Sequence, residues 1–200
     1  MPHELTLAEL DRRRAAARAM GGQEKLAKRA ERGQLNAEER LAALIDANSF
    51  LEVGLLGASG VFEQDAPVTP RDSKITGFTT KGASTSATNS KKIGYVRKAC
   101  NENGMPFIHI GESTGARLPD AMGSKGMGTL LGNDPTQFKR MREVPWIAAA
   151  LDTAFGSSAW LCCCADYAVM KKGSIMSVSS PRLVSMAIGE KVDLEQLGGW

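Results

Sequence analysis

Several patterns that would assign a chemistry at once are missing from this chain of 200 residues. It has only two histidines, His3 and His109, and they are isolated in the sequence, so Ser–His–Asp catalysis is not expected. The four cysteines include no Cys-x2-Cys pair, which argues against a zinc site, and no metal is expected. The Gly-rich patterns of P-loop and dinucleotide-binding proteins are absent as well.

No apolar run approaches the roughly 20 residues that a membrane-spanning helix needs, so no membrane partner is expected. The N-terminus lacks the apolar core of a secretory signal, and three acidic residues (Glu4, Glu9 and Asp11) argue against a mitochondrial transit peptide. The expected location is therefore cytoplasmic, or the mitochondrial matrix in a eukaryote, where cysteines stay reduced.

Charge is unevenly distributed along the chain. The net charge is +3, which is too weak to indicate a nucleic-acid partner. From Arg12 to Arg32, however, the sequence contains eight basic residues and two acidic ones, which gives this stretch a net charge of +6. This run is either a solvated helix face or an electrostatic landing surface for an anionic ligand such as a phosphorylated cofactor.

The chain divides into a charged, helix-like N-terminal region (1–47) and a remainder (48–200). The remainder begins with a linker-like stretch to about residue 80, and from Lys81 strand and helix patterns alternate. "NSKKIGYVRKAC" predicts a helix that ends at Asn103-Gly104, and "MPFIHIGE", "PWIAAALD" and "YAVMKKGSIMSVSS" predict short strands. This alternation indicates an α/β fold with a mainly parallel sheet.

Three Gly-rich turns occur at strand-to-helix junctions, at 81–86, 111–120 and 154–160. Backbone N–H groups converge at such junctions, so together the turns predict a shared site for an anion or a developing oxyanion. Directly after the third turn come Cys162, Cys163 and Cys164. We interpret them as small apolar residues on a buried segment, because free cysteine is commonly buried.

An ordered series of motifs carries a family resemblance from about Gly21 to Trp200. "KGASTSATNSKK", "GESTGARLPD", "MREVPWIAAALDTAFGSSAWLCCCADYAVM" and "AIGEKVDLEQLGG" resemble the N-terminal domain of the carboxyltransferase subunit of biotin-dependent acyl-CoA carboxylases. The resemblance implies a crotonase-like spiral of ββα units. It also implies that this domain binds an acyl-CoA thioester and stabilises its enolate during carboxyl transfer from carboxybiotin.

The resemblance places the enolate-stabilising amides at Gly156 and Ser157. It places substrate binding at Gly82, Ala83, Ser84, Thr114, Gly115, Ala116, Arg117 and Ser158. It implies that biotin arrives on the carrier protein of a biotin carboxylase partner, that biotin itself is the base, and that the subunits form a homo-oligomer, a hexamer in the family. Two alternatives remain: a biotin-dependent acyl-CoA decarboxylase, and a non-catalytic CoA-binding or assembly subunit.

The chain departs from the family pattern in its turns, where Ala83, Thr114 and Ser157 each replace a glycine of the family, and at the junction of Thr80 and Lys81. The usual Ala-Gly-Gly-Ala of the third turn is Phe155-Gly156-Ser157-Ser158 here. Ser157 adds a side chain where the family has glycine, which keeps the backbone donor but changes the shape of the turn. A strand pair of roughly fifteen residues is also expected between Thr80 and Lys81, where the sequence runs on directly.

Overall fold

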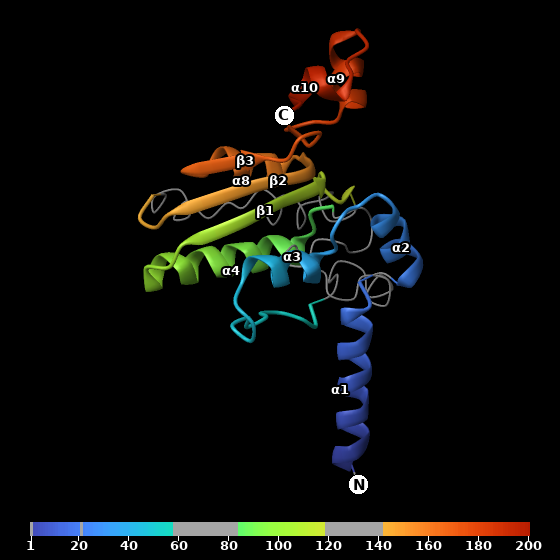
Figure 1. Ribbon diagram of the computed structural model, residues 1–200, viewed down its shortest axis with the longest axis vertical. Coiled ribbons are helices and arrows are strands. Elements are labelled where there is room, and N and C mark those ends of the chain that lie inside the picture. The colour runs from blue at the N-terminus through green and yellow to red at the C-terminus, as the bar shows by residue number, and fades with distance from the viewer. Residues whose placement is uncertain (1, 21, 58–83, 119–141) are drawn as a thin grey trace.

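The computed structural model describes residues 2–20, 22–57, 84–118 and 142–200. Its N-terminal region contains helices α1 (Pro2–Arg18), α2 (Gln23–Glu31) and α3 (Ala37–Leu44), as the charged sequence predicts. Helix α3 begins with a capping box, in which Asn36 and Glu39 each satisfy a backbone N–H of the other. Helix α1 extends away from the rest of the molecule (Figure 1).

Helix α4 (Ala87–Asn103) connects the first Gly-rich turn to the sheet. Ser86 caps its start by accepting the Asn89 N–H, and Gly104 ends it in the left-handed conformation. Cys100 belongs to the core cluster and Ile93 and Val96 pack against it, so the helix predicted from this stretch is confirmed together with its buried face.

Four parallel strands form the described sheet: β1 (Phe107–Thr114), β2 (Trp146–Phe155), β3 (Tyr167–Met170) and β4 (Ile175–Ser177). Strand β2 is central, with β1 on one side. On its other side, β3 pairs with the first half of β2 and β4 with the last three residues (Figure 1). The predicted α/β class with a parallel sheet is therefore confirmed.

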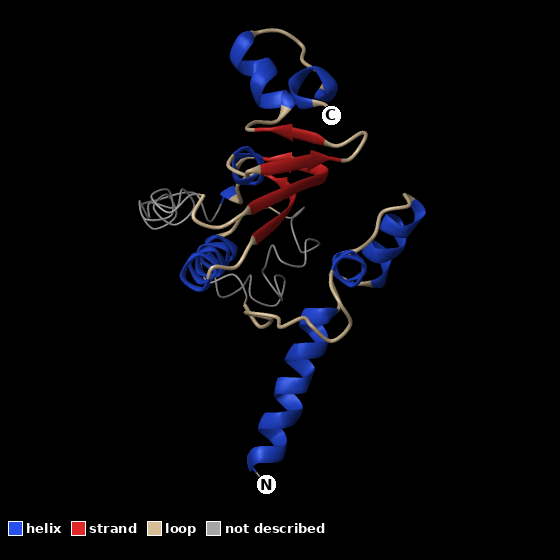
Figure 2. Ribbon diagram, turned by 60° about the vertical axis from the view of Figure 1, so that its left-hand side comes forward, coloured by secondary structure: helices blue, strands red, loops and turns tan. Residues whose placement is uncertain are grey.

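Small residues along β2 allow a helix to lie close to the sheet. Ala148, Ala150 and Ala154 are buried against helix α8 (Ser157–Cys163) together with Cys162. A neighbouring cluster joins α4 to the strands through Phe107 and Trp146, whose rings meet edge to face. Helices lie on both sides of the sheet in Figure 2, with α4 and α8 on one side and α2 and α3 on the other.

The chain ends in two short helices, α9 (Pro181–Ile188) and α10 (Leu194–Gly198). Gly198 allows the backbone of α10 to approach Met176 so closely that a side chain there would collide with the Met176 carbonyl oxygen. None of the helices in the described part of the chain is long and apolar enough to cross a membrane.

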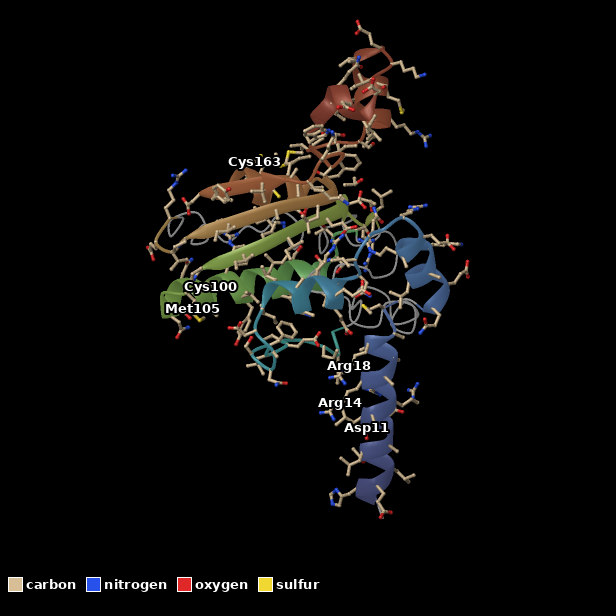
Figure 3. All side chains as sticks on the ribbon, viewed as in Figure 1. Asp11, Arg14, Arg18, Cys100, Met105 and Cys163 are labelled. Carbon is tan, nitrogen blue, oxygen red and sulfur yellow. The ribbon has the colours of Figure 1, made fainter. Side chains whose placement is uncertain are left out.

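The three consecutive cysteines differ in burial, which corrects the prediction that all three lie inside. Cys162 faces the sheet at 2% exposure, Cys164 is half-buried, and Cys163 is exposed on the outer side of α8 (Figure 3). Successive residues of a helix point about 100° apart, so three in a row cannot all face one surface. Burial raises the pKa of the Cys164 thiol, and it does the same for Cys100 on α4.

This difference predicts unequal effects of two otherwise identical substitutions. Cys162→Ala should lower the free energy of unfolding by about 1 kcal/mol, because it removes a buried sulfur, whereas Cys163→Ala should change it by less than about 0.5 kcal/mol. Urea denaturation of the two variants measures both values. Equal losses would contradict this orientation of α8.

Candidate functional site

The first two Gly-rich turns meet side by side beyond the end of β1. Thr85 and Ala116 form a short parallel bridge. The Thr85 N–H donates to the Gly115 carbonyl oxygen at 2.7 Å, and the Arg117 N–H donates to the Thr85 carbonyl oxygen at 2.8 Å. The segment before α4 thus lies against the turn that comes after β1.

The third turn meets the second at Gly156. This residue has φ 62° and ψ −124°, a conformation open to glycine and to few other residues. A Cβ built on Gly156 would lie 3.5 Å from the Cα of Gly115, and the preceding residues Thr114 and Phe155 are paired, so the two glycines lie side by side. The hydroxyl groups of Thr85 and Ser157 also share a hydrogen bond of 2.8 Å, which ties the first turn to the third.

All three turns therefore gather at the carboxyl ends of β1 and β2, the edge at which ligands bind in many parallel sheets. The predicted site residues are exposed to different degrees. Thr114 and Ala116 are exposed and Gly115 is half-buried, whereas Ser84, Arg117 and Ser158 are buried. The buried side chains can hold the turns in place, and the exposed ones can meet a ligand. Gly82 and Ala83 lie outside the described residues, as does the junction of Thr80 and Lys81.

The amide of Gly156 already has an acceptor in this structure. It donates to the carbonyl oxygen of Ser177, at the end of β4, at 3.1 Å. This hydrogen bond would have to break before the Gly156 N–H could face a substrate oxygen. Within α8 the first backbone hydrogen bond runs from the Trp160 N–H to the Gly156 carbonyl oxygen, so the amides of Ser157 and Ser158 precede the helical ladder.

The second turn also matches the Gly-x-Ser-x-Gly pattern of hydrolase nucleophile elbows, from Gly111 to Gly115, which the sequence interpretation passed over. The geometry does not fit that role. Ser113 is 1% exposed and its hydroxyl accepts the Gly115 N–H at 3.1 Å. A nucleophile elbow instead presents its serine to solvent on a strained turn.

His109 is isolated in the sequence but not in the structure, which corrects the interpretation of this residue. Its Nε2 lies 3.3 Å from the Ser158 hydroxyl oxygen, at the start of α8. Both side chains are buried, so the pair is not accessible to a substrate. The contact links β1 to the third turn on the buried side of the turn. The sequence did not indicate it, because the two residues are 49 positions apart.

An ion-pair cluster beside the turns was also missed. The Glu112 carboxylate, on β1, lies 3.3 Å from Arg29 Nη2 of α2 and 2.6 Å from Arg40 Nη1 of α3. Arg29 and Glu112 are only 5% and 9% exposed. The available signal in the sequence was an acidic residue, Glu112, near the start of the second Gly-rich motif.

Burial governs the ionisation of this cluster. It raises the pKa of Glu112 above its ordinary value, and the two guanidinium groups oppose that rise. Burial likewise lowers the pKa of Arg29, against the opposing effect of Glu112. Burying these three charged groups therefore costs free energy, and the attraction between the carboxylate and the two guanidinium groups offsets that cost.

The Arg12–Arg32 run is accordingly not one continuous landing surface. Arg29 is buried against Glu112. Arg12 and Arg13 pair with Glu9 on their own helix. Arg14 and Arg18 lie along α1, which points away from the sheet (Figure 3). Several basic side chains of this run therefore form ion pairs within the protein.

The residues that the structure describes hold no group of three or more His, Cys, Asp or Glu side chains placed to bind a metal ion. What the described turns offer a ligand is backbone N–H groups at the start of a helix, with hydroxyl groups nearby. Such groups suit an oxygen atom that carries or develops negative charge.

Comparison with known proteins agrees with this arrangement. The family model described as "Carboxyl transferase domain" matches residues 28–200. The chain belongs to the carboxyl transferase domain family. Its three turns and parallel sheet are therefore elements of a carboxyl transferase domain, as the resemblance in the sequence implied.

Known carboxyl transferase proteins match almost the whole chain. The propionyl-CoA carboxylase beta chain of Roseobacter denitrificans is 31% identical and covers 96% of this chain. The methylmalonyl-CoA decarboxylase subunit alpha of Veillonella parvula is 27% identical over 92% of it. A solved transcarboxylase 12S structure, a hexamer assembly with methylmalonyl-CoA and methylmalonic acid bound, superposes on 98% of the chain with a TM-score of 0.78 and 26% identity.

These carboxyl transferase relatives are considerably longer than the present chain. The chain spans 41% of the propionyl-CoA carboxylase beta chain, 40% of the decarboxylase subunit and 41% of the transcarboxylase 12S chain.

Proposed function

We propose that this chain is the acyl-CoA half-site of a biotin-dependent acyl-CoA carboxylase. The observation that carries the proposal is the meeting of the three turns at the carboxyl ends of β1 and β2, with Gly115 and Gly156 side by side. Gly115 and Gly156 carry no side chains, so a backbone donor at this place can approach the oxygen of a thioester closely.

In this proposal the thioester oxygen lies at the start of α8. The Ser157 amide donates to it as the α-proton leaves and negative charge develops on the oxygen. One preorganised donor of this kind contributes on the order of 10²–10³ in rate. Gly156 shapes the turn, and its own N–H becomes a second donor if it leaves the Ser177 carbonyl oxygen.

The remaining predicted residues hold the turn or contact the ligand. Thr114, Gly115 and Ala116 line the open side, while Ser84, Arg117 and Ser158 brace it from within. A carboxylated biotin on a carrier protein supplies the carboxyl group. No accessible side-chain base is needed from the described turns if the biotin takes the α-proton, and the buried His109 does not serve as one.

The same proposal identifies the partners. A biotin carboxylase with its carrier protein would deliver the biotin, and a second carboxyl transferase domain would complete the site. Subunits would assemble as a homo-oligomer, as in the hexameric transcarboxylase 12S. The decarboxylase alternative stays open because the methylmalonyl-CoA decarboxylase subunit is also similar to the chain.

Binding and turnover together test the proposal. The chain alone should bind propionyl-CoA in isothermal titration calorimetry, yet carboxylate it negligibly with carboxylated biotin. Addition of a carboxyl transferase domain that supplies the biotin side should restore turnover. Failure to bind any acyl-CoA would contradict the proposal, and efficient carboxylation by the chain alone would contradict the half-site. Restored release of CO2 from methylmalonyl-CoA, without net carboxylation, would favour the decarboxylase.

A further inference from the structure

We propose that Arg29 and Arg40 are positioning residues for the candidate site: through Glu112, the N-terminal helices act as a clip that fixes the ends of β1 and β2. The effect on catalysis rests on the proposed carboxyl transfer function, whereas the clip itself is a statement about the fold. The clip consists of Arg29, Gln34 and Arg40 on the helical side, and Glu112 and Asp152 on the sheet.

The clip grips the sheet at a point where its pairing is irregular. Gly111 pairs with Ala150, but the next paired residue of β1, Ser113, lies opposite Ala154. One residue of β1 therefore faces three residues of β2, which makes this place a β-bulge. A bulge bends its strand and so changes the direction in which the chain leaves the sheet.

Both acidic residues of the bulge are held by the N-terminal region. Glu112 is the β1 residue inside it, and Arg29 and Arg40 bind its carboxylate from two different helices. Asp152 lies in the β2 part, and Gln34 Nε2 donates to its Oδ2 at 2.9 Å. The two carboxylates repel each other, since Asp152 acts on the pKa of Glu112 in the direction opposite to the arginines.

The bulge leads directly into the site. Glu112 precedes Ser113, whose hydroxyl accepts the Gly115 N–H. Asp152 lies four residues before Gly156, and Gly115 and Gly156 are the residues at which the two turns lie side by side. A small shift of either strand at the bulge is therefore passed to the contact between the turns, and catalytic geometry tolerates little displacement.

The direction in which the Glu112 side chain points shows that it is a positioning residue and not a catalytic one. Along β1, Phe107, His109, Gly111 and Ser113 are buried on the face covered by α8, where Gly111 lies against Cys162 and Ser158. Side chains alternate along a strand, so Glu112 points to the opposite face, toward the N-terminal helices. It acts on the turn through the backbone.

Hydrogen exchange of the full chain tests the clip. Arg40→Met removes the closer partner of Glu112 and should raise exchange about tenfold or more in the segments 111–117 and 153–158, because these segments open locally. Exchange in α9 should stay within about twofold. Arg13→Met is the matched control: it removes an exposed arginine that pairs with Glu9, and exchange at the site should not change.

Rescue separates positioning from a plain loss of stability. Adding Glu112→Gln to Arg40→Met removes the carboxylate that has lost a partner, and exchange at the two turns should return to within about threefold of the parent. If Arg40→Met does not fold, the same comparison is made with Arg40→Lys, which keeps the charge but lacks the planar fork, and the same local opening is expected to a smaller extent.

Three outcomes would overturn the clip: unchanged exchange at the turns, a uniform rise along the whole chain, or no rescue by Glu112→Gln. Calorimetry with propionyl-CoA on the same variants keeps the two proposals apart. Local opening in a chain whose parent binds no acyl-CoA would support the clip and contradict the proposed function. The opposite result is equally tight acyl-CoA binding in the parent, in Arg40→Met and in Arg13→Met, with unchanged exchange. It would support the proposed function and contradict the clip.

Discussion

Gly156→Val should lower carboxylation in a reconstituted complex by about 100-fold or more, a loss typical of a reacting group displaced by roughly 1 Å. The residue adopts φ 62° and ψ −124°, which a β-branched residue reaches only with strain. Its first side-chain atom would already lie 3.5 Å from the Gly115 Cα, so the methyl groups of valine would separate the turns. Steady-state rates, corrected for the folded fraction, measure the effect.

Two matched variants show whether the loss belongs to the site. Ser157→Gly removes the hydroxyl that bonds Thr85 but keeps the amide, so most activity should remain. Gly104→Val introduces the same residue at another positive φ, at the far end of α4, about 25 Å along the helix from Ser86. It should affect stability and leave the rate per folded molecule nearly unchanged. Equal activity losses at Gly104 and Gly156 would contradict the site assignment.

Arg29→Met alone should lower the free energy of unfolding by about 1–3 kcal/mol, less than the roughly 3–5 kcal/mol lost when a buried charge is left with no partner, because Glu112 keeps Arg40. Glu112 would keep Arg40 but lose its second partner in a place where water cannot replace it. The Arg29 Nε hydrogen bond to the Leu35 carbonyl oxygen would be lost as well. Urea denaturation of the full chain measures the change.

Replacing the whole cluster provides the control. A variant with Arg29→Met, Glu112→Leu and Arg40→Met removes all three charges of the ion-pair cluster and leaves Asp152 with its Gln34 partner, so it should recover most of the lost stability. The exposed pair of Lys28 and Glu24 provides a second comparison, and Lys28→Met should cost less than about 0.5 kcal/mol. If Arg29→Met were as mild as Lys28→Met, the buried cluster would not be an energetic link between the helices and the sheet.

The parts of the fold that short-range rules govern could be read from the sequence. The capping box of Asn36 and Glu39 and the helix end at Gly104 each depend on a few neighbouring residues. The meeting of the turns after β1 and β2 was also predictable, because parallel strands end at the same edge of a sheet. The family resemblance then supplied the chemistry that spacing alone could not.

What the sequence did not reveal depends on contacts between distant residues. Arg29 and Glu112 are 83 positions apart and belong to no periodic pattern, so the run of basic residues was considered only as a surface. The contact of His109 with Ser158 spans 49 positions and was missed for the same reason. The acceptor of the Gly156 amide, Ser177, was not foreseeable because it depends on where β4 pairs with β2.

The row of alanines on β2 limits how this domain can change. Ala148, Ala150 and Ala154 are fully buried against α8, and a side chain added at Gly111 would come within 2.8 Å of the Cys162 sulfur. Variants with larger side chains on that inner face would push away the helix that carries the site. Mutational libraries aimed at a different substrate will therefore find tolerance on the outer face of α8, at Trp160 and Cys163, and on the rims of the turns.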